Sequence, residues 1–141
     1  MLSEKNKIIQ KIPNLSSSEV NNIHLFINEA LLFNNKHNIF VRESFDDVLN
    51  KDIIDCMPLI KKIKNNTKIL DLGSGGGFPG ILIAILKANC EIHLVEKAQK
   101  KAYFLKKMKD MLKLKNTEVI NNKLLSKNNI GFYDVITARA F

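Results

Sequence analysis

The stretch from Ile69 to Gly80, with the sequence ILDLGSGGGFPG, is the feature that most constrains how this chain of 141 residues folds. An apolar run ends on an acid and gives way to five glycines within eight residues. Glycines occur this densely where a backbone turns sharply and lets a ligand approach closely. In an open α/β sheet, ligands bind beyond the carboxyl ends of the strands, so a loop at this place predicts a ligand site.

The segment after residue 67 alternates short apolar runs of strand type with longer runs of helix type. Strands are expected at 68–72, 91–96, 117–122 and 133–139, and helices at 78–87 and 98–115. This alternation predicts βαβ units and a parallel sheet.

The first part of the chain is predicted to be helical. Ser16 and Glu19 form a capping-box pattern at the start of one helix. A second helix is expected after Ser44, with Asp47 as its capping partner; it reaches Pro58, and the segment LIKKIKNN (residues 59–66) closes this helical region. We therefore expect a small helical cap followed by an α/β core.

These two parts set the expected domains and the compartment. The helical region is placed at residues 1–66 and the core at residues 67–141. No apolar run approaches the roughly 18–20 residues of a membrane span, and the N-terminus lacks the apolar core of a signal peptide. A cytoplasmic location is expected, in which Cys56 and Cys90, without metal-ligand spacing, are reduced and structural.

The glycines permit two registers, and each predicts a different ligand. The pattern G-x-G-x-x-G falls on Gly75, Gly77 and Gly80 and is typical of dinucleotide sites. The pattern D-x-G-x-G-x-G instead starts at Asp71 and continues through Gly73, Gly75 and Gly77.

Two residues favour the second register and S-adenosyl-L-methionine as the cofactor, and a third fits either ligand. A dinucleotide needs its pyrophosphate over a helix N-terminus, where Pro79 removes a backbone donor. A carboxylate at Asp71 suits a ligand with an ammonium and a sulfonium group and would repel a pyrophosphate. Glu96 ends the second strand, at the distance of about 20 residues from which an acid reaches the ribose hydroxyls, and both ligands have a ribose.

The other cofactor contacts are expected from the same edge of the sheet. The backbone at Gly73 and Gly75 should face the methionine moiety, and Phe78 should close over the cofactor. The turn after the third strand, near Leu124 and Leu125, is where the adenine should lie.

The formal charge of +8 fits a partner that carries phosphates, such as nucleic acid. The alternative is that the abundance of Lys, Asn and Ile reflects an A/T-rich coding sequence. Arg42 and Arg139 are the two arginines, and Arg139, after the fourth strand, is predicted to contact a phosphate or the cofactor carboxylate. Lysines also mark the outer face of the 98–115 helix, which favours RNA or is simply a solvated surface: Lys100, Lys101, Lys107 and Lys109.

Three segments together resemble a known family. These are DLGSGGGFPGILIAI, EKAQKKAYFLKKMKDMLKLKN and ITARAF. They are similar to the bacterial 16S rRNA guanine-N(7) methyltransferases, the glucose-inhibited division protein B family, and the resemblance covers roughly residues 20–141. It implies a Rossmann-like class I methyltransferase sheet with an N-terminal helical cap.

The resemblance implies transfer of a methyl group to ring nitrogen 7 of a guanine in 16S rRNA. Gly73, Phe78, the Leu124–Leu125 pair and Arg139 match the cofactor-binding positions of the family. No catalytic residue is expected, because that nitrogen carries a lone pair and no proton, and positioning can supply most of the acceleration. The implied partner is 16S rRNA or the small ribosomal subunit, with a monomer favoured.

Departures from the family pattern keep a second function open. Lys51 and Asp52 stand where Arg-His is usual, and Lys123 and Leu125 replace an Arg-x-Glu element after the third strand. The chain also stops just after the fourth strand, where such sheets usually have seven, so we expect a truncated form. The alternative function is a remnant that binds cofactor or RNA without catalysis. A methyltransferase acting on a small molecule or a protein is a third possibility.

Overall fold

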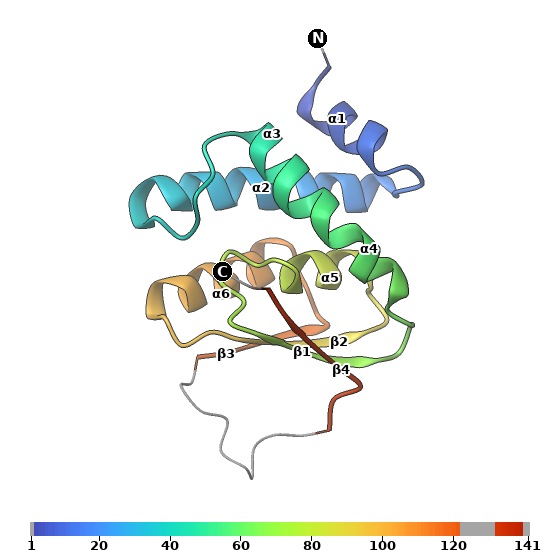
Figure 1. Ribbon diagram of the computed structural model, residues 1–141, viewed down its shortest axis with the longest axis vertical. Helices are drawn as coiled ribbons and strands as arrows, with labels where there is room; N and C mark the ends of the chain where they lie inside the picture. Colours follow the sequence, from blue (N-terminus) through green and yellow to red (C-terminus); the bar gives the residue numbers. More distant parts are fainter. Residues whose placement is uncertain (1, 122–131, 140–141) are drawn as a thin grey trace.

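A computed structural model describes residues 2–121 and 132–139 of the chain (Figure 1). The helices are α1 (Glu4–Lys11), α2 (Ser17–His37), α3 (Phe45–Val48), the π-helical turn η1 (Leu49–Ile53), α4 (Ile54–Lys62), α5 (Gly80–Leu86) and α6 (Gln99–Met111). The strands are β1 (Lys68–Leu72), β2 (Glu91–Val95), β3 (Thr117–Ile120) and β4 (Val135–Ala138).

The strands form one parallel sheet in the order β3-β2-β1-β4. Leu70 of β1 lies between His93 of β2 and Ile136 of β4. The predicted parallel α/β sheet is therefore confirmed. Because the chain leaves β1 toward β2 on one side and reaches β4 on the other, the carboxyl end of β1 is the switch point at which such sheets bind ligands.

The helices that the structure describes lie on one face of the sheet (Figure 1). α5 and α6 cover the strands, and α2 packs over both helices. One hydrophobic core runs through these layers and includes residues from both parts of the chain, from Ile8 to Leu114. The division into domains at residue 66 stays a prediction. In the described part of the chain, no helix has both the length and the apolar character needed to cross a membrane.

The second helical run extends past Pro58 and ends at Lys62. A proline in a helix interior removes one backbone hydrogen bond, but the turn around it buries Cys56 and Ile60. Tertiary burial therefore carries the helix beyond the residue where the local sequence favours an end. Cys56 and Cys90 are both free and buried, as expected.

The capping box at the start of α2 is present as predicted. The Ser16 hydroxyl accepts from the Glu19 N–H at 3.1 Å, and the Glu19 carboxylate accepts from the Ser16 N–H at 2.9 Å. We expect Ser16→Ala to lower the free energy of unfolding by about 1 kcal/mol, because the Glu19 N–H loses its hydrogen-bond acceptor. Urea unfolding measures this, with Ser18→Ala as the control at about 0.5 kcal/mol or less. Equal effects of the two substitutions would contradict a specific cap.

Candidate functional site

A cavity of about 450 Å³ lies beside the glycine loop at the carboxyl end of the sheet. Small-molecule sites typically enclose about 300–1,000 Å³, so its volume suits a ligand of cofactor size. Its walls come from the loop, from the segment after α2, from η1, from α6 and from the end of β4. The lining residues are Ile39, Phe40, Val41, Arg42, Asp52, Ser74, Gly75, Gly76, Phe78, Lys101 and Arg139.

The glycine loop follows β1 through a chain of left-handed backbone conformations. φ is +65° at Gly73, +53° at Gly75 and +97° at Gly77. The Gly73 N–H donates to the Val95 carbonyl at 2.8 Å, which fixes the loop to the end of β2. A Cβ at Gly75 would meet only the Gly73 carbonyl, at 3.7 Å, so the backbone there is open to close approach by a ligand.

Phe78 forms the apolar wall of the cavity. Its ring packs on the Phe26 ring, with centroids 4.9 Å apart, and stacks with the Phe40 ring at 6.4 Å. Phe26 belongs to α2 and Phe40 follows that helix, so the helical region holds the loop in place from outside the sheet.

Glu96 supports the loop from beneath rather than lining the cavity. One carboxylate oxygen accepts from the Gly75 N–H and the other from the Ala98 N–H, each at 2.9 Å. A carboxylate has about four acceptor positions, so two remain for further donors such as ribose hydroxyls.

The side chain of Asp71 points into the protein and not into the cavity. Its Oδ1 accepts from the Thr137 hydroxyl at 2.7 Å, while its buried Oδ2 has no hydrogen-bond partner among the described atoms. A Cβ at Gly80 would lie 2.5 Å from that Oδ2, so the carboxylate packs against the start of α5. Burial raises the pKa of Asp71 from 3.8 to about 6, against opposing hydrogen bonds from Thr137 and Ser74.

The free energy of unfolding should therefore depend on pH through Asp71. Because its pKa is higher in the folded protein, the stability that it contributes is complete below pH 3.8 and is lost as the pH rises through about 6. Asp71→Asn cannot titrate in this range. One pKa unit corresponds to about 1.4 kcal/mol. Between about pH 4 and about pH 7.5, the free energy of unfolding of the variant should therefore rise by about 2–3 kcal/mol relative to that of the wild type. Urea unfolding across this range measures the shift, and a difference that stays constant with pH would contradict it.

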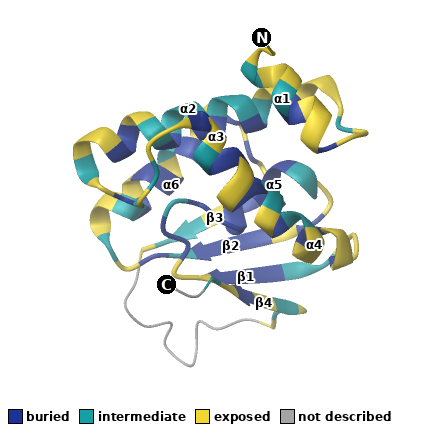
Figure 2. Cartoon of the chain, turned by 45° about the horizontal axis from the view of Figure 1, so that its top comes forward, coloured by how far each residue is buried: buried dark blue, intermediate teal, exposed yellow. Residues whose placement is uncertain are grey.

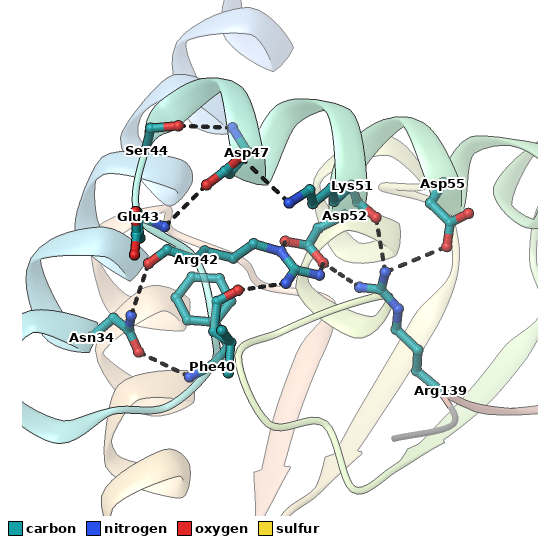
Figure 3. Close-up of polar contacts among 11 residues, drawn as sticks. Asn34, Phe40, Arg42, Glu43, Ser44, Asp47, Lys51, Asp52, Asp55 and Arg139 are labelled. Atoms are coloured by element: carbon teal, nitrogen blue, oxygen red, sulfur yellow. Dashed lines mark hydrogen bonds and ion pairs between the residues drawn. The ribbon is translucent and has the colours of Figure 1, made fainter.

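Both arginines of the chain converge on one buried carboxylate at the cavity wall (Figure 3). Asp52, whose side chain is 3% exposed, accepts from Arg42 Nε at 2.9 Å and Nη2 at 3.1 Å, and from Arg139 Nη1 at 2.6 Å. Arg139 also donates to the Lys51 carbonyl at 2.9 Å and lies 3.4 Å from the exposed Asp55 carboxylate.

This cluster, Arg42–Asp52–Arg139, joins three segments that are distant in the sequence. Burial acts to lower the pKa of Arg139, but the hydrogen bond and the charge of Asp52 outweigh it and raise that pKa above its ordinary value. Two guanidinium groups thus stand beside one buried carboxylate. The cavity lining contains Arg42, Lys101 and Arg139 and one acid, Asp52, and this excess of positive charge suits an anionic group.

The structure brings some of the predicted site residues together and leaves others apart. Gly75, Phe78 and Arg139 line the cavity. Gly73, Asp71 and Glu96 lie behind it in the loop and the strand ends, and Leu124 and Leu125 lie outside the described residues.

Sequence reasoning did not predict that Arg42, Asp52, Phe40 and Lys101 line the same cavity. The one available signal was Asp52, an acid at a place where the resembling family usually has histidine. Its partners could not be known, because they are 10 and 87 residues away in the chain.

The site does not fit a pyrophosphate over a helix N-terminus. Pro79, which has no N–H, occupies the N-cap of α5, and Gly80 is buried against Leu94 and Asp71. The open glycine backbone, the aromatic wall and the positive wall together suit a ligand with an apolar body and one carboxylate.

Comparisons with known proteins agree with this geometry. The family model described as GidB, rRNA small subunit methyltransferase G, matches residues 19–141. A ribosomal RNA small subunit methyltransferase G of Polynucleobacter asymbioticus is 35% identical over 134 residues, covering 90% of this chain and 60% of the relative. One of Borrelia garinii subsp. bavariensis is 37% identical over 128 residues, covering 87% of this chain and 60% of the relative. The chain thus spans about 60% of the length of these relatives.

Solved structures share the fold at low sequence identity. A protein described as a protein-L-isoaspartate O-methyltransferase from Plasmodium falciparum, in complex with S-adenosyl-L-homocysteine, matches with a TM-score of 0.60 and 15% identity, covering 98% of this chain and 73% of that one. A protein described as an O-methyltransferase from Klebsiella pneumoniae matches with a TM-score of 0.60 and 16% identity, covering 94% of this chain and 57% of that one. These similarities bear out the predicted methyltransferase sheet.

Proposed function

The chain belongs to the GidB family of rRNA small subunit methyltransferases G, and from this we propose that it binds S-adenosyl-L-methionine and serves methyl transfer to ring nitrogen 7 of a guanine in 16S rRNA. The observation that carries the proposal is the meeting of the glycine loop, Phe78 and Arg139 at one cavity of suitable volume.

The residues that line the cavity and those that lie behind it each have a role in this proposal. The backbone at Gly73 and Gly75 faces the methionine part of the donor, and Phe78 covers its apolar side. Arg139 pairs with the donor carboxylate, while the remaining acceptor positions of Glu96 hold the ribose hydroxyls. Asp71 supports the loop from beneath, where its carboxylate packs against the start of α5. We assign the adenine to the chain near Leu124 and Leu125.

The chemistry asks little of the side chains beyond positioning. The bound donor supplies a methyl group on a sulfonium: its carbon–sulfur bond breaks, a bond from that carbon to N7 forms, and the positive charge passes to the guanine ring. N7 has no proton to lose, so no general base is required. The cavity contributes by holding the two reactants in line and by excluding water.

Arg139→Gln should separate ligands that have the amino-acid part from those that lack it. Because a hydrogen bond to a charged group contributes about 1.5–3 kcal/mol, we expect S-adenosyl-L-homocysteine to bind roughly tenfold or more weakly. 5′-Methylthioadenosine, which lacks the carboxylate, should bind the variant and the wild type alike. Titration calorimetry measures both, and equal losses for the two ligands would contradict a carboxylate contact.

Two measurements test the proposed function itself. The first is binding of S-adenosyl-L-methionine to the folded chain, and the absence of binding heat would overturn the proposal. The second is 7-methylguanosine in 16S rRNA from a strain that lacks its own family enzyme and expresses this chain. An unmodified guanine in the presence of soluble, donor-binding protein would favour the alternative of binding without catalysis.

The proposal entails 16S rRNA or the small ribosomal subunit as the partner and the cytoplasm as the location. The basic composition of the chain supports a partner with phosphates. A monomeric state remains our prediction.

A further inference from the structure

A large aromatic ring stands in solvent on the outer side of α6. Tyr103 is 62% exposed although it is in the middle of a well-packed helix. Its ring is held in place, because it stacks on Phe33 of α2 with centroids 6.0 Å apart and an interplanar angle of 26°. α2 and α6 lie side by side (Figure 2), and this pair of helices backs the ring. An exposed ring on a rigid support is a ready platform for a flat partner.

Lysines flank this ring along the helix. Lys100 and Lys106 are exposed, three positions before and after Tyr103, and therefore share its face of the helix. Within the described residues, the lysines in ion pairs are Lys7, Lys51 and Lys107, so neither flanking lysine is engaged. Asp110 is the acid on the same face, and Lys107 is paired with Glu29.

The positive charge at the start of α6 opposes what helix stability alone would favour. A helix N-terminus is stabilised by acids and destabilised by cations. The first turn of α6 has no acid and instead carries Lys100 and Lys101, and its N-cap residue Ala98 makes no side-chain cap. Charge placed against the helix dipole fits a surface that receives an anion.

We propose that Tyr103 with Lys100 and Lys106, here called the α6 patch, binds a single-stranded segment of RNA, with one base stacked on Tyr103 and phosphates held by the lysines. This inference rests on the proposed function, since it assigns a binding surface to the RNA substrate of that function. Stacking requires an unpaired base, so the patch selects single strands over duplexes.

Helix α6 contributes both to the α6 patch and to the cavity wall. Lys101, the residue after Lys100, lines the cavity, whereas Tyr103, two residues further on, points to a different face of the helix.

Binding of a fluorescein-labelled RNA of about 20 nucleotides, as a single strand and as a duplex with its complement, tests the proposal by fluorescence anisotropy. Tyr103→Ala should weaken binding of the single strand about five- to a hundredfold, because base stacking on an aromatic side chain is lost. Tyr103→Phe keeps the ring and should restore binding to within about twofold of the wild type. Lys100→Gln should lower the slope of log K against log salt by about 0.7, the value for one phosphate contact on a single strand.

The control is Phe132→Ala, which removes an aromatic ring that is 98% exposed outside the α6 patch and should leave binding unchanged. Tyr103→Ala with wild-type affinity, no binding of the single strand, or an equal loss on single strand and duplex would overturn the inference. Calorimetry with S-adenosyl-L-homocysteine separates the two proposals. If Tyr103→Ala still binds the donor but no longer binds RNA, both proposals are supported. If the protein binds RNA through Tyr103 but does not bind the donor, the proposed function alone is contradicted.

Discussion

Replacing Phe26 with alanine should lower the free energy of unfolding by about 3–5 kcal/mol, because a fully buried ring is lost and leaves a cavity. Phe26 sits where the helical region meets the core, with the Phe78 ring 4.9 Å away on one side and the Phe104 ring 6.5 Å away on another. Urea unfolding at neutral pH measures the change. The variant should also bind S-adenosyl-L-homocysteine more weakly than the wild type, since Phe78 loses its support.

Leu32→Ala is the control on the same helix. Leu32 is 57% exposed, so its truncation should cost about 0.5 kcal/mol or less. Comparable losses of unfolding free energy in Phe26→Ala and Leu32→Ala would contradict the role of Phe26 in packing α2 against the core.

A methyl group added at Gly77 should lower the free energy of unfolding by about 2–5 kcal/mol, from backbone strain together with overpacking. φ is +97° at this residue, a value that residues with a Cβ rarely adopt. The added Cβ would also lie 2.9 Å from both Phe26 Cζ and Ile81 Cγ1. Thermal or urea unfolding of Gly77→Ala measures the loss.

The neighbouring glycine offers a matched control for this second prediction. A Cβ at Gly76 would touch the Phe40 ring at 3.6 Å and the Phe78 ring at 3.9 Å, both ordinary contacts, so Gly76→Ala should cost far less. The double variant Phe26→Ala with Gly77→Ala should be more stable than the sum of the single losses, because removal of the ring makes room for the methyl group. Strict additivity would show that the two residues do not compete for the same space.

The fold was largely predictable because its signals are local. The capping box at Ser16, the alternation of apolar runs and the left-handed glycines each depend on a few neighbouring residues, and each is present in the structure. The helix through Pro58 was the exception, since burial of Ile60 is set by the rest of the core.

The candidate site was predictable only in part, because side-chain direction depends on tertiary contacts. Asp71 ends up between Thr137 and Gly80, and Glu96 is engaged by backbone N–H groups, two arrangements that spacing does not reveal. The convergence of Arg42 and Arg139 on Asp52 likewise required the packing of η1 against the end of β4.

The Arg42–Asp52–Arg139 cluster has a thermodynamic consequence for any ligand in the cavity. Its carboxylate belongs to the helical region, whereas Arg139 belongs to the sheet. A ligand that lies against both would bind only while the two parts are docked, so its binding free energy would add to the free energy that keeps them together. Occupancy of the cavity and cohesion of the fold would then be two measures of one equilibrium.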